Sequence, residues 1–261
     1  MRYVLANWKM YPTVDQARAV LAAVQAGVAE RLGPASTLPQ VIVCPPFVAL
    51  APLRALVDGE VVRLGAQNCH WEQRGPYTGE VSAAMLGGLV DYVMVGHSER
   101  RAAGETDEQI AAKVAAVAAA GLVPVVFVGE DDAADDPLRA AEERLRRALA
   151  RIDPATWPFI VVYEPAWAIG APEPAPPDHV GRAVDHLKAA LGGLGTPEPV
   201  VLYGGAVDED DLDPLLALES LDGVGATRAT LDADSFLRII DRVASHGGAP
   251  GRRDAGAIPS P

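Results

Sequence analysis

Eight short apolar runs, separated by longer stretches of helical character, constrain this chain more than any other feature. Because the runs are continuous and do not alternate with polar residues, they predict strands buried on both faces. Strands that alternate with helices predict a parallel sheet, and eight such units match a closed (β/α)8 barrel in a single α/β domain. An open doubly wound sheet is the structural alternative. The runs cover residues 3–6, 41–44, 61–66, 92–96, 122–129, 159–163, 200–205 and, more weakly, 224–226.

Several intervening stretches carry explicit helix signals. An Ala-rich segment from Asp15 to Leu32 stops before Gly33 and Pro34, residues that end helices. Acids or proline at the first turn predict further helices from Thr106 to Ala120, from Pro137 to about Arg151, and after Asp232. Residues 247–261 have no periodicity, which predicts a barrel over 1–246 followed by a disordered tail.

Composition removes several functional classes. The chain has 261 residues, 49% of them hydrophobic, and a formal net charge of -13, which argues against nucleic acid and anionic membrane surfaces as partners. A locally positive pocket still permits a small anionic substrate. Cys44 and Cys69 are too few for a disulfide framework or a zinc site, and no metal-ligand cluster or dinucleotide fingerprint occurs, so we expect no cofactor. Without a secretory signal or a run of ~20 apolar residues, we expect a cytoplasmic enzyme.

Polar side chains stand where the predicted strands end, and barrel enzymes build their active sites at those ends. A carboxylate, an imidazole and an amine at one mouth suit proton abstraction next to a carbonyl. The carboxylate is the base, and the other two groups stabilise the enediolate oxygen. Glycine-rich turns offer N–H groups to a phosphate. The residues are Asn7, Lys9, His97, Glu99, Glu164, Gly204, Gly205, Thr227 and Arg228.

Longer stretches of the chain resemble the triosephosphate isomerase family, in the family's order and along nearly all of residues 1–245. The resemblance implies a closed barrel that interconverts an aldose phosphate and a ketose phosphate. The default pair is D-glyceraldehyde 3-phosphate and dihydroxyacetone phosphate, and the pathways are glycolysis and gluconeogenesis. The matching stretches include NWKM (7–10), CPPFVAL (44–50), GAQN (65–68), GPYTGEVSAAML (75–86), YVMVGHSERR (92–101), VGE (128–130), YEPAWAIG (163–170) and YGGAV (203–207).

The same resemblance implies a role for each residue at the mouth. Glu164 is the base that moves the proton, His97 a neutral electrophile, and Lys9 the cation near the oxyanion. Asn7 positions Lys9 and the substrate, and Glu99 supports the site behind His97. The phosphate-binding positions are Gly170, Gly204, Gly205, Ala206, Thr227 and Arg228.

Two further segments acquire roles from the family. Residues 165–175, which include Trp167, correspond to a mobile lid whose closure excludes water. The GPYTG loop corresponds to a segment that enters a neighbouring subunit, so Thr78 is the expected contact of a homodimer.

The chain departs from the family where phosphate binds. Thr227 and Arg228 occupy positions where the family usually has two adjacent glycines, which let backbone amides approach a phosphate closely. Arg228 either replaces that contact with a charge-assisted fork or fills the pocket and blocks it.

The lid departs as well. Pro172 has no N–H and Ala206 no hydroxyl, so both halves of one family latch are missing. A second latch, from the N–H of Ala175 to Tyr203, remains possible. The prolines of this stretch predict a lid that is shaped before it closes.

Two other departures concern the pocket walls. Phe127 stands where the family commonly has a small residue, and the segment between Arg101 and Gly104 is one residue short. Two alternatives to a triose isomerase stay open, and the changed phosphate loop is where a change of substrate chain length would be expected to show. One is a paralogue acting on a four-carbon ketose phosphate such as an erythrulose phosphate. The other is a catalytically silent barrel with a binding role, against which the five retained catalytic residues argue.

Overall fold

Eight parallel strands close into one barrel in chain order, and β8 pairs back onto β1. The computed structural model describes residues 2–32, 38–131, 136–171 and 173–246. The predictions that concern Gly33, Pro34, Pro172 and the tail at 247–261 fall outside these ranges. The predicted barrel is confirmed, with strands β1 (Tyr3–Asn7), β2 (Gln40–Cys44), β3 (Val62–Ala66), β4 (Tyr92–Val95), β5 (Val123–Val128), β6 (Ile160–Tyr163), β7 (Val201–Gly204) and β8 (Gly223–Ala226).

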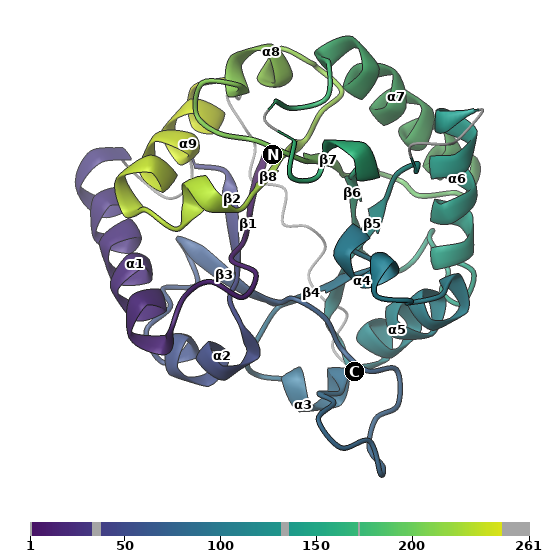
Figure 1. The fold of residues 1–261 in the computed structure, drawn as a ribbon, viewed down its shortest axis with the longest axis horizontal. Coiled ribbons are helices and arrows are strands. Elements are labelled where there is room, and N and C mark those ends of the chain that lie inside the picture. The colour runs from purple at the N-terminus through teal and green to yellow at the C-terminus, as the bar shows by residue number, and fades with distance from the viewer. Residues whose placement is uncertain (1, 33–37, 132–135, 172, 247–261) are drawn as a thin grey trace.

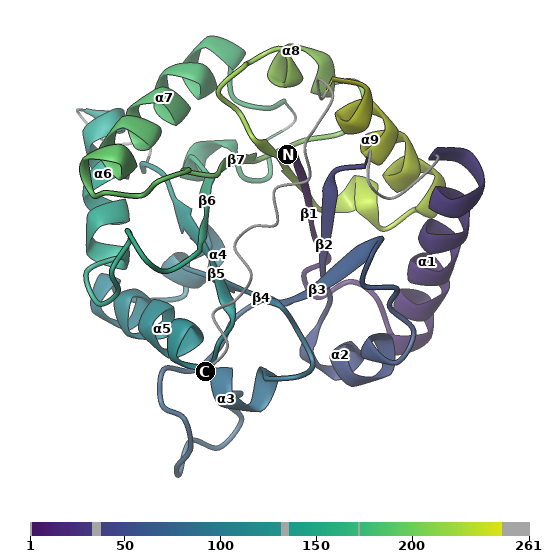
Figure 2. The same ribbon diagram turned by 180° about the vertical axis from the view of Figure 1, so that it is seen from behind.

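Helices form a ring around the barrel (Figure 1; Figure 2). The long helix predicted to run to Leu32 is α1 as far as Gly27 and then a π-helical turn, η1 (Val28–Leu32). Two 3-10 turns, η3 (Ala166–Ala168) and η4 (Arg228–Thr230), follow β6 and β8. The α-helices are α1 (Val14–Gly27), α2 (Phe47–Arg54), α3 (Ala83–Leu86), α4 (Ser98–Ala102), α5 (Asp107–Ala119), α6 (Pro137–Ala148), α7 (Pro177–Gly193), α8 (Leu212–Leu216) and α9 (Ala233–His246).

Side chains alternate across the barrel wall, as the two-residue period of a strand requires. One core fills the barrel itself and includes Leu5, Ile42, Met94, Phe127 and Leu202. The intervening residues belong to a second core between the strands and the helices. Asn7, Phe127 and Glu164 continue the inward-facing series of their strands, so they end up at the mouth of the barrel.

Capping side chains explain where several helices begin. Thr13 with Gln16, and Thr106 with Gln109, form capping boxes at the starts of α1 and α5. The proline-rich stretch after β6 ends in Pro176 at the N-cap and Pro177 at the first helical position of α7. Proline is favoured there because its missing N–H would be unpaired in any case. Part of that stretch therefore starts a helix.

The loop between β3 and α3 projects beyond the ring of helices (Figure 1; Figure 2). Its base is ordered by aromatic contacts, because the His70 ring stacks on Trp71 at 4.1 Å and lies 4.4 Å from Tyr77. Thr78 follows Tyr77 and is exposed. Within the part of the chain that the structure describes, no helix is long and apolar enough to cross a membrane.

Candidate active site

One cavity of about 530 Å³ opens at the C-terminal ends of the strands. It brings together every residue predicted for catalysis or phosphate binding. The other predicted residues do not line it: Trp167 and Ala175 lie in the predicted lid, Tyr203 lies beside it in β7, and Thr78 lies in the projecting loop. The predicted residues that line the cavity are Asn7, Lys9, His97, Glu99, Glu164, Gly170, Gly204, Gly205, Ala206, Thr227 and Arg228.

Lys9 has a strained backbone that its neighbours hold in place. Its φ of 46° makes it the single non-glycine residue with positive φ among the described residues, a conformation that costs on the order of 1–3 kcal/mol. Its N–H donates to Asn7 Oδ1 at 3.0 Å. Gln67 Nε2 donates both to the Lys9 carbonyl at 2.9 Å and to the Cys44 carbonyl at 2.8 Å. These bonds fix the backbone conformation of Lys9, and so the direction of its side chain, just after β1 ends.

The Lys9 ammonium is held at the edge of the cavity. Its Nζ donates to Glu99 Oε1 at 2.7 Å, and the Glu99 side chain is 56% exposed. A partner so well solvated contributes little free energy, but it fixes one of the three ammonium donors. The other two remain available to a substrate oxygen.

His97 is fixed in one tautomer. It caps α4, and its Nδ1 accepts the Glu99 N–H at 3.1 Å. An accepting Nδ1 places the hydrogen of the neutral ring on Nε2. That Nε2 lies 3.1 Å from Glu164 Oε1. The imidazole therefore presents an N–H donor to the cavity.

Glu164 is buried, with 5% of its surface exposed. Its Oε2 accepts the backbone N–H of Ser98 at 2.8 Å, while Oε1 faces His97. The backbone behind it is crowded, because a Cβ on Gly129 would lie 2.0 Å from the Glu164 carbonyl oxygen. Glycine at position 129 is thus required where β5 and β6 end.

Burial separates the pKa values of these two groups. It raises the pKa of Glu164 to about 7, against the opposing effects of the hydrogen bond from the Ser98 backbone N–H and of the Lys9 charge. Burial also lowers the pKa of His97 to about 4, helped by the nearby Lys9 charge. At neutral pH the imidazole is uncharged and the carboxyl group is near its midpoint, which suits one as hydrogen-bond donor and the other as general base.

The loops after β7 and β8 form another part of the cavity. Gly205 must lack a side chain, because a Cβ there would lie 2.3 Å from the Tyr203 hydroxyl. Arg228 is exposed in η4, and among the described residues its guanidinium has no ion-pair partner. Asp208 and Asp211 line the same region. Burial, and then the proximity of Asp208, raise the pKa of Asp211.

The segment predicted to be a lid is held near both of its ends by hydrogen bonds. The Ala175 N–H donates to the Tyr203 hydroxyl at 2.7 Å, which is the geometry of the remaining latch. Trp167 Nε1 donates at 2.9 Å to Glu130, a carboxylate that is 2% exposed and also accepts the Tyr163 hydroxyl. His179, at the start of α7, lies 3.2 Å from the same carboxylate. Trp167 from the predicted lid and His179 from the helix that follows it therefore meet at Glu130.

Comparison with known proteins agrees with this geometry. The sequence model of the triosephosphate isomerase family matches residues 2–243. The chain belongs to the triosephosphate isomerase family. Curated relatives named triosephosphate isomerase include one from Roseiflexus sp. (strain RS-1), 42% identical over 90% of this chain and 94% of its own length. Another, from a Dehalococcoides mccartyi strain, is 36% identical over 92% of this chain and 96% of its own length.

Membership of the triosephosphate isomerase family makes the chain an aldose–ketose isomerase by class. Three residues that hold the site were not predicted from the sequence: Gln67, Ser98 and Glu130. All three lie in stretches that carried the resemblance, GAQN, GHSERR and VGE. The residue types of Ser98 and Gln67 gave no sequence signal for these roles. Ser98 acts through its backbone N–H, and the Gln67 side chain donates to backbone carbonyls of other residues.

Proposed function

We propose that this chain interconverts D-glyceraldehyde 3-phosphate and dihydroxyacetone phosphate through an enediolate. The observation that carries the proposal is the buried pair of Glu164 and His97, with the His97 Nε2–H 3.1 Å from the carboxylate. The relatives that carry the name triosephosphate isomerase support the three-carbon substrate.

The reaction moves one proton between adjacent carbons. The Glu164 carboxylate removes a proton from the carbon next to the ketone, and the C–H electrons form the carbon–carbon double bond as the carbonyl oxygen becomes an oxyanion. The His97 Nε2–H and the Lys9 ammonium stabilise that oxyanion. Glu164 then returns the proton to the former carbonyl carbon, and the hydroxyl-bearing carbon becomes the aldehyde. The hydroxyl proton passes to the original oxyanion, so the two compounds are isomers.

Asn7 and Glu99 are positioning residues in this scheme. Asn7 holds the Lys9 backbone and Glu99 holds its ammonium, at 3.0 Å and 2.7 Å respectively. Both line the cavity with Lys9. Their distances support a role in aiming the cation at the substrate oxygen.

The phosphate is bound by the loops after β6, β7 and β8. Gly170, Gly204, Gly205, Ala206 and Thr227 line this part of the cavity and offer backbone N–H groups. Arg228 adds a guanidinium that forms no ion pair among the described residues, which favours the ligand role over the blocking one. The Ala175–Tyr203 latch and the Trp167–Glu130 bond hold the lid over the bound substrate.

The protein acts as a homodimer in this proposal. Three apolar side chains, Met10, Tyr11 and Phe47, are 94%, 60% and 38% exposed and border a second pocket of about 500 Å³. Lys9 and His97 also line that pocket. The projecting loop of a second copy, which contains Thr78, would enter this pocket and complete the site. Light scattering at micromolar concentration tests the dimer, and a monomer that is fully active would overturn it.

A coupled isomerase assay tests the activity. It compares D-glyceraldehyde 3-phosphate with a four-carbon ketose phosphate at matched concentrations. We expect a higher kcat/KM for the triose. A preference for the four-carbon substrate would favour an erythrulose phosphate isomerase, and no turnover of either by folded protein would favour a silent barrel. A cytoplasmic location and a place in glycolysis and gluconeogenesis accompany the triose activity.

A further inference from the structure

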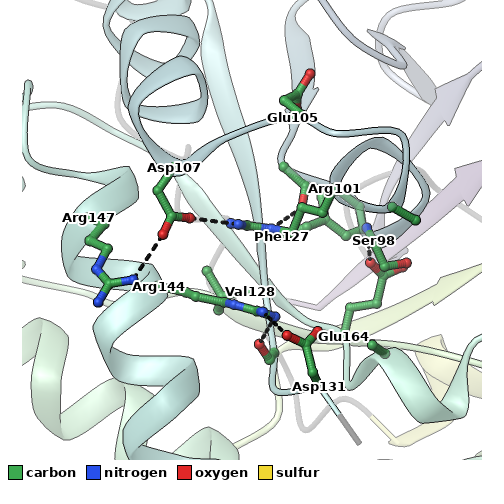
Figure 3. A pocket seen from close by; sticks show the side chains of 14 residues that line it. Ser98, Arg101, Glu105, Asp107, Phe127, Val128, Asp131, Arg144, Arg147 and Glu164 are labelled. Carbon is green, nitrogen blue, oxygen red and sulfur yellow. Dashed lines mark hydrogen bonds and ion pairs between the residues drawn. The ribbon is translucent and has the colours of Figure 1, made fainter.

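A third cavity, of about 440 Å³, lies behind the catalytic base (Figure 3). Its walls come from the ends of β4 and β5 and from α4, α5 and α6, and they are strongly polar. Asp107 accepts hydrogen bonds from Arg101 at 2.7 Å and from Arg147 at 3.0 Å. Arg144 donates to the Gly129 carbonyl at 2.6 Å and pairs with Asp131. We call this cavity the rear cleft.

The rear cleft is open to water. Asp131 and Arg147, which line it, have side chains that are 67% and 58% exposed. A water molecule occupies ~30 Å³ of liquid, so the cleft has room for many. Ser98 Oγ and Arg101 Nη2, which belong to residues that line the cleft, are themselves buried and have no hydrogen-bond partner among the described residues.

Two side chains line both the rear cleft and the substrate cavity: Phe127 and Glu164. Figure 3 shows the Glu164 carboxylate directed toward Ser98 at one side of the cleft. Phe127 and Glu164 are only 4% and 5% exposed, so neither cavity extends far past these two side chains. At this point only the side chains of Phe127 and Glu164 separate the rear cleft from the substrate cavity. One of these two side chains is the proposed base.

Phe127 is packed as a fixed part of this wall. It is the last inward-facing residue of β5, and its ring lies 5.1 Å from the His97 ring at an angle of 58°. On β7 the facing residue is Gly204, where a Cβ would lie 3.9 Å from Phe127 Cε1. The Phe127 ring thus contacts the His97 ring, and the absence of a side chain at Gly204 leaves space for the Phe127 ring.

We infer that Phe127 is a positioning residue that walls the substrate cavity off from the rear cleft and limits the water that reaches Glu164 and His97. The inference rests on the proposed isomerase function for its consequence in catalysis. Removing the ring joins the two cavities and hydrates the carboxylate from behind. Hydration favours the charged forms of both groups, so the pKa of Glu164 falls and that of His97 rises. The transferred proton also meets water while it resides on Glu164.

The test replaces Phe127 with Val, which removes the ring and keeps a good strand former. The first readout is the pKa of the Glu164 carboxyl group, followed by NMR with isotope-labelled glutamate and assigned by its absence in Glu164→Gln. We expect a decrease of more than about one pH unit in the variant. The second readout is the deuterium content of product formed in heavy water, which we expect to increase severalfold.

The matched control is Leu202→Val, which shortens another fully buried side chain of the same inner core outside both cavities. It should lower stability and leave both readouts unchanged. Phe127→Leu keeps more of the side-chain volume, so it should shift both readouts in the same direction as Phe127→Val by a smaller but still measurable amount. A folded Phe127→Val with an unchanged Glu164 pKa and deuterium content overturns the inference. Should Phe127→Val not fold, Phe127→Leu decides, because a folded Leu variant with no shift at all has the same meaning. The NMR readout needs no substrate, so a wild-type protein that fails to isomerise triose phosphate overturns the proposed function separately.

Discussion

The two ends of the substrate cavity are built differently. At the catalytic end, Lys9, His97 and Glu164 are each held by backbone hydrogen bonds of 2.8–3.1 Å, from Ser98, Glu99 and the groups around Lys9. At the phosphate end, Arg228 is exposed and two aspartates share the wall with it. The first region is organised before substrate arrives, and the second depends on charge and on the lid.

This difference predicts which kinetic constant, kcat or KM, each end of the cavity affects. Donors fixed in a buried site act on the transition state without reorganising, which raises kcat. An exposed cation acts equally on bound substrate and transition state, which mainly lowers KM. Substitutions at the catalytic end should therefore change kcat most, and those at the phosphate end KM.

Replacing the base should have the largest effect. In Glu164→Gln the side chain keeps its size but cannot accept a proton, so kcat should fall by ~10²–10⁴-fold while the fold persists. Steady-state kinetics and circular dichroism measure the two quantities. Glu142→Gln, which removes a carboxylate paired with Arg146 on α6, is the control. A folded Glu164→Gln with unchanged kcat would falsify the mechanism.

Loosening the Lys9 backbone should have an intermediate effect. Gln67→Leu removes both hydrogen bonds to backbone carbonyls, at about 1 kcal/mol each. Were that loss felt wholly in the transition state, kcat would fall by roughly thirtyfold. Gln25→Leu, which breaks comparable bonds to Leu56 and Asp58 on the surface, controls for general destabilisation. Equal losses of kcat in the two variants would show that Gln67 does not act by holding the Lys9 backbone in its strained conformation.

Removing the exposed cation should have the smallest effect and a different character. Arg228→Ala should raise KM by about tenfold, equivalent to ~1.4 kcal/mol, and weaken inhibition by inorganic phosphate to a similar degree. Its kcat should change little. Arg238→Ala, which breaks an ion pair with Glu209 outside the cavity, is the matched control. Unchanged KM and unchanged phosphate inhibition would remove Arg228 from the list of ligands and leave the backbone amides alone in that role.

The same contrast marks the limit of what the sequence could predict. The eight apolar runs predicted all eight strands, because a buried parallel strand requires a continuous apolar segment. Glu164 and His97 were predicted because strand ends must meet at one mouth. The Ser98 N–H, the His97 tautomer and the Lys9 φ depend on backbone geometry that no residue type encodes. Phe127 was recognised as unusual, but its place between two cavities required the fold.

The central claim is that burial at the catalytic end sets Glu164 and His97 to opposite tasks, and the pH dependence of kcat/KM tests it most directly. The substrate phosphate ionises near pH ~6, so its titration is measured by phosphorus NMR and divided out. The rate should then fall tenfold per pH unit below the Glu164 pKa of about 7, because a protonated carboxyl group cannot act as base. No limb from His97 should appear above its pKa of about 4. An acid limb near the ordinary carboxyl value of ~4.3, or a limb near the ordinary imidazole value of ~6.5, would contradict the account.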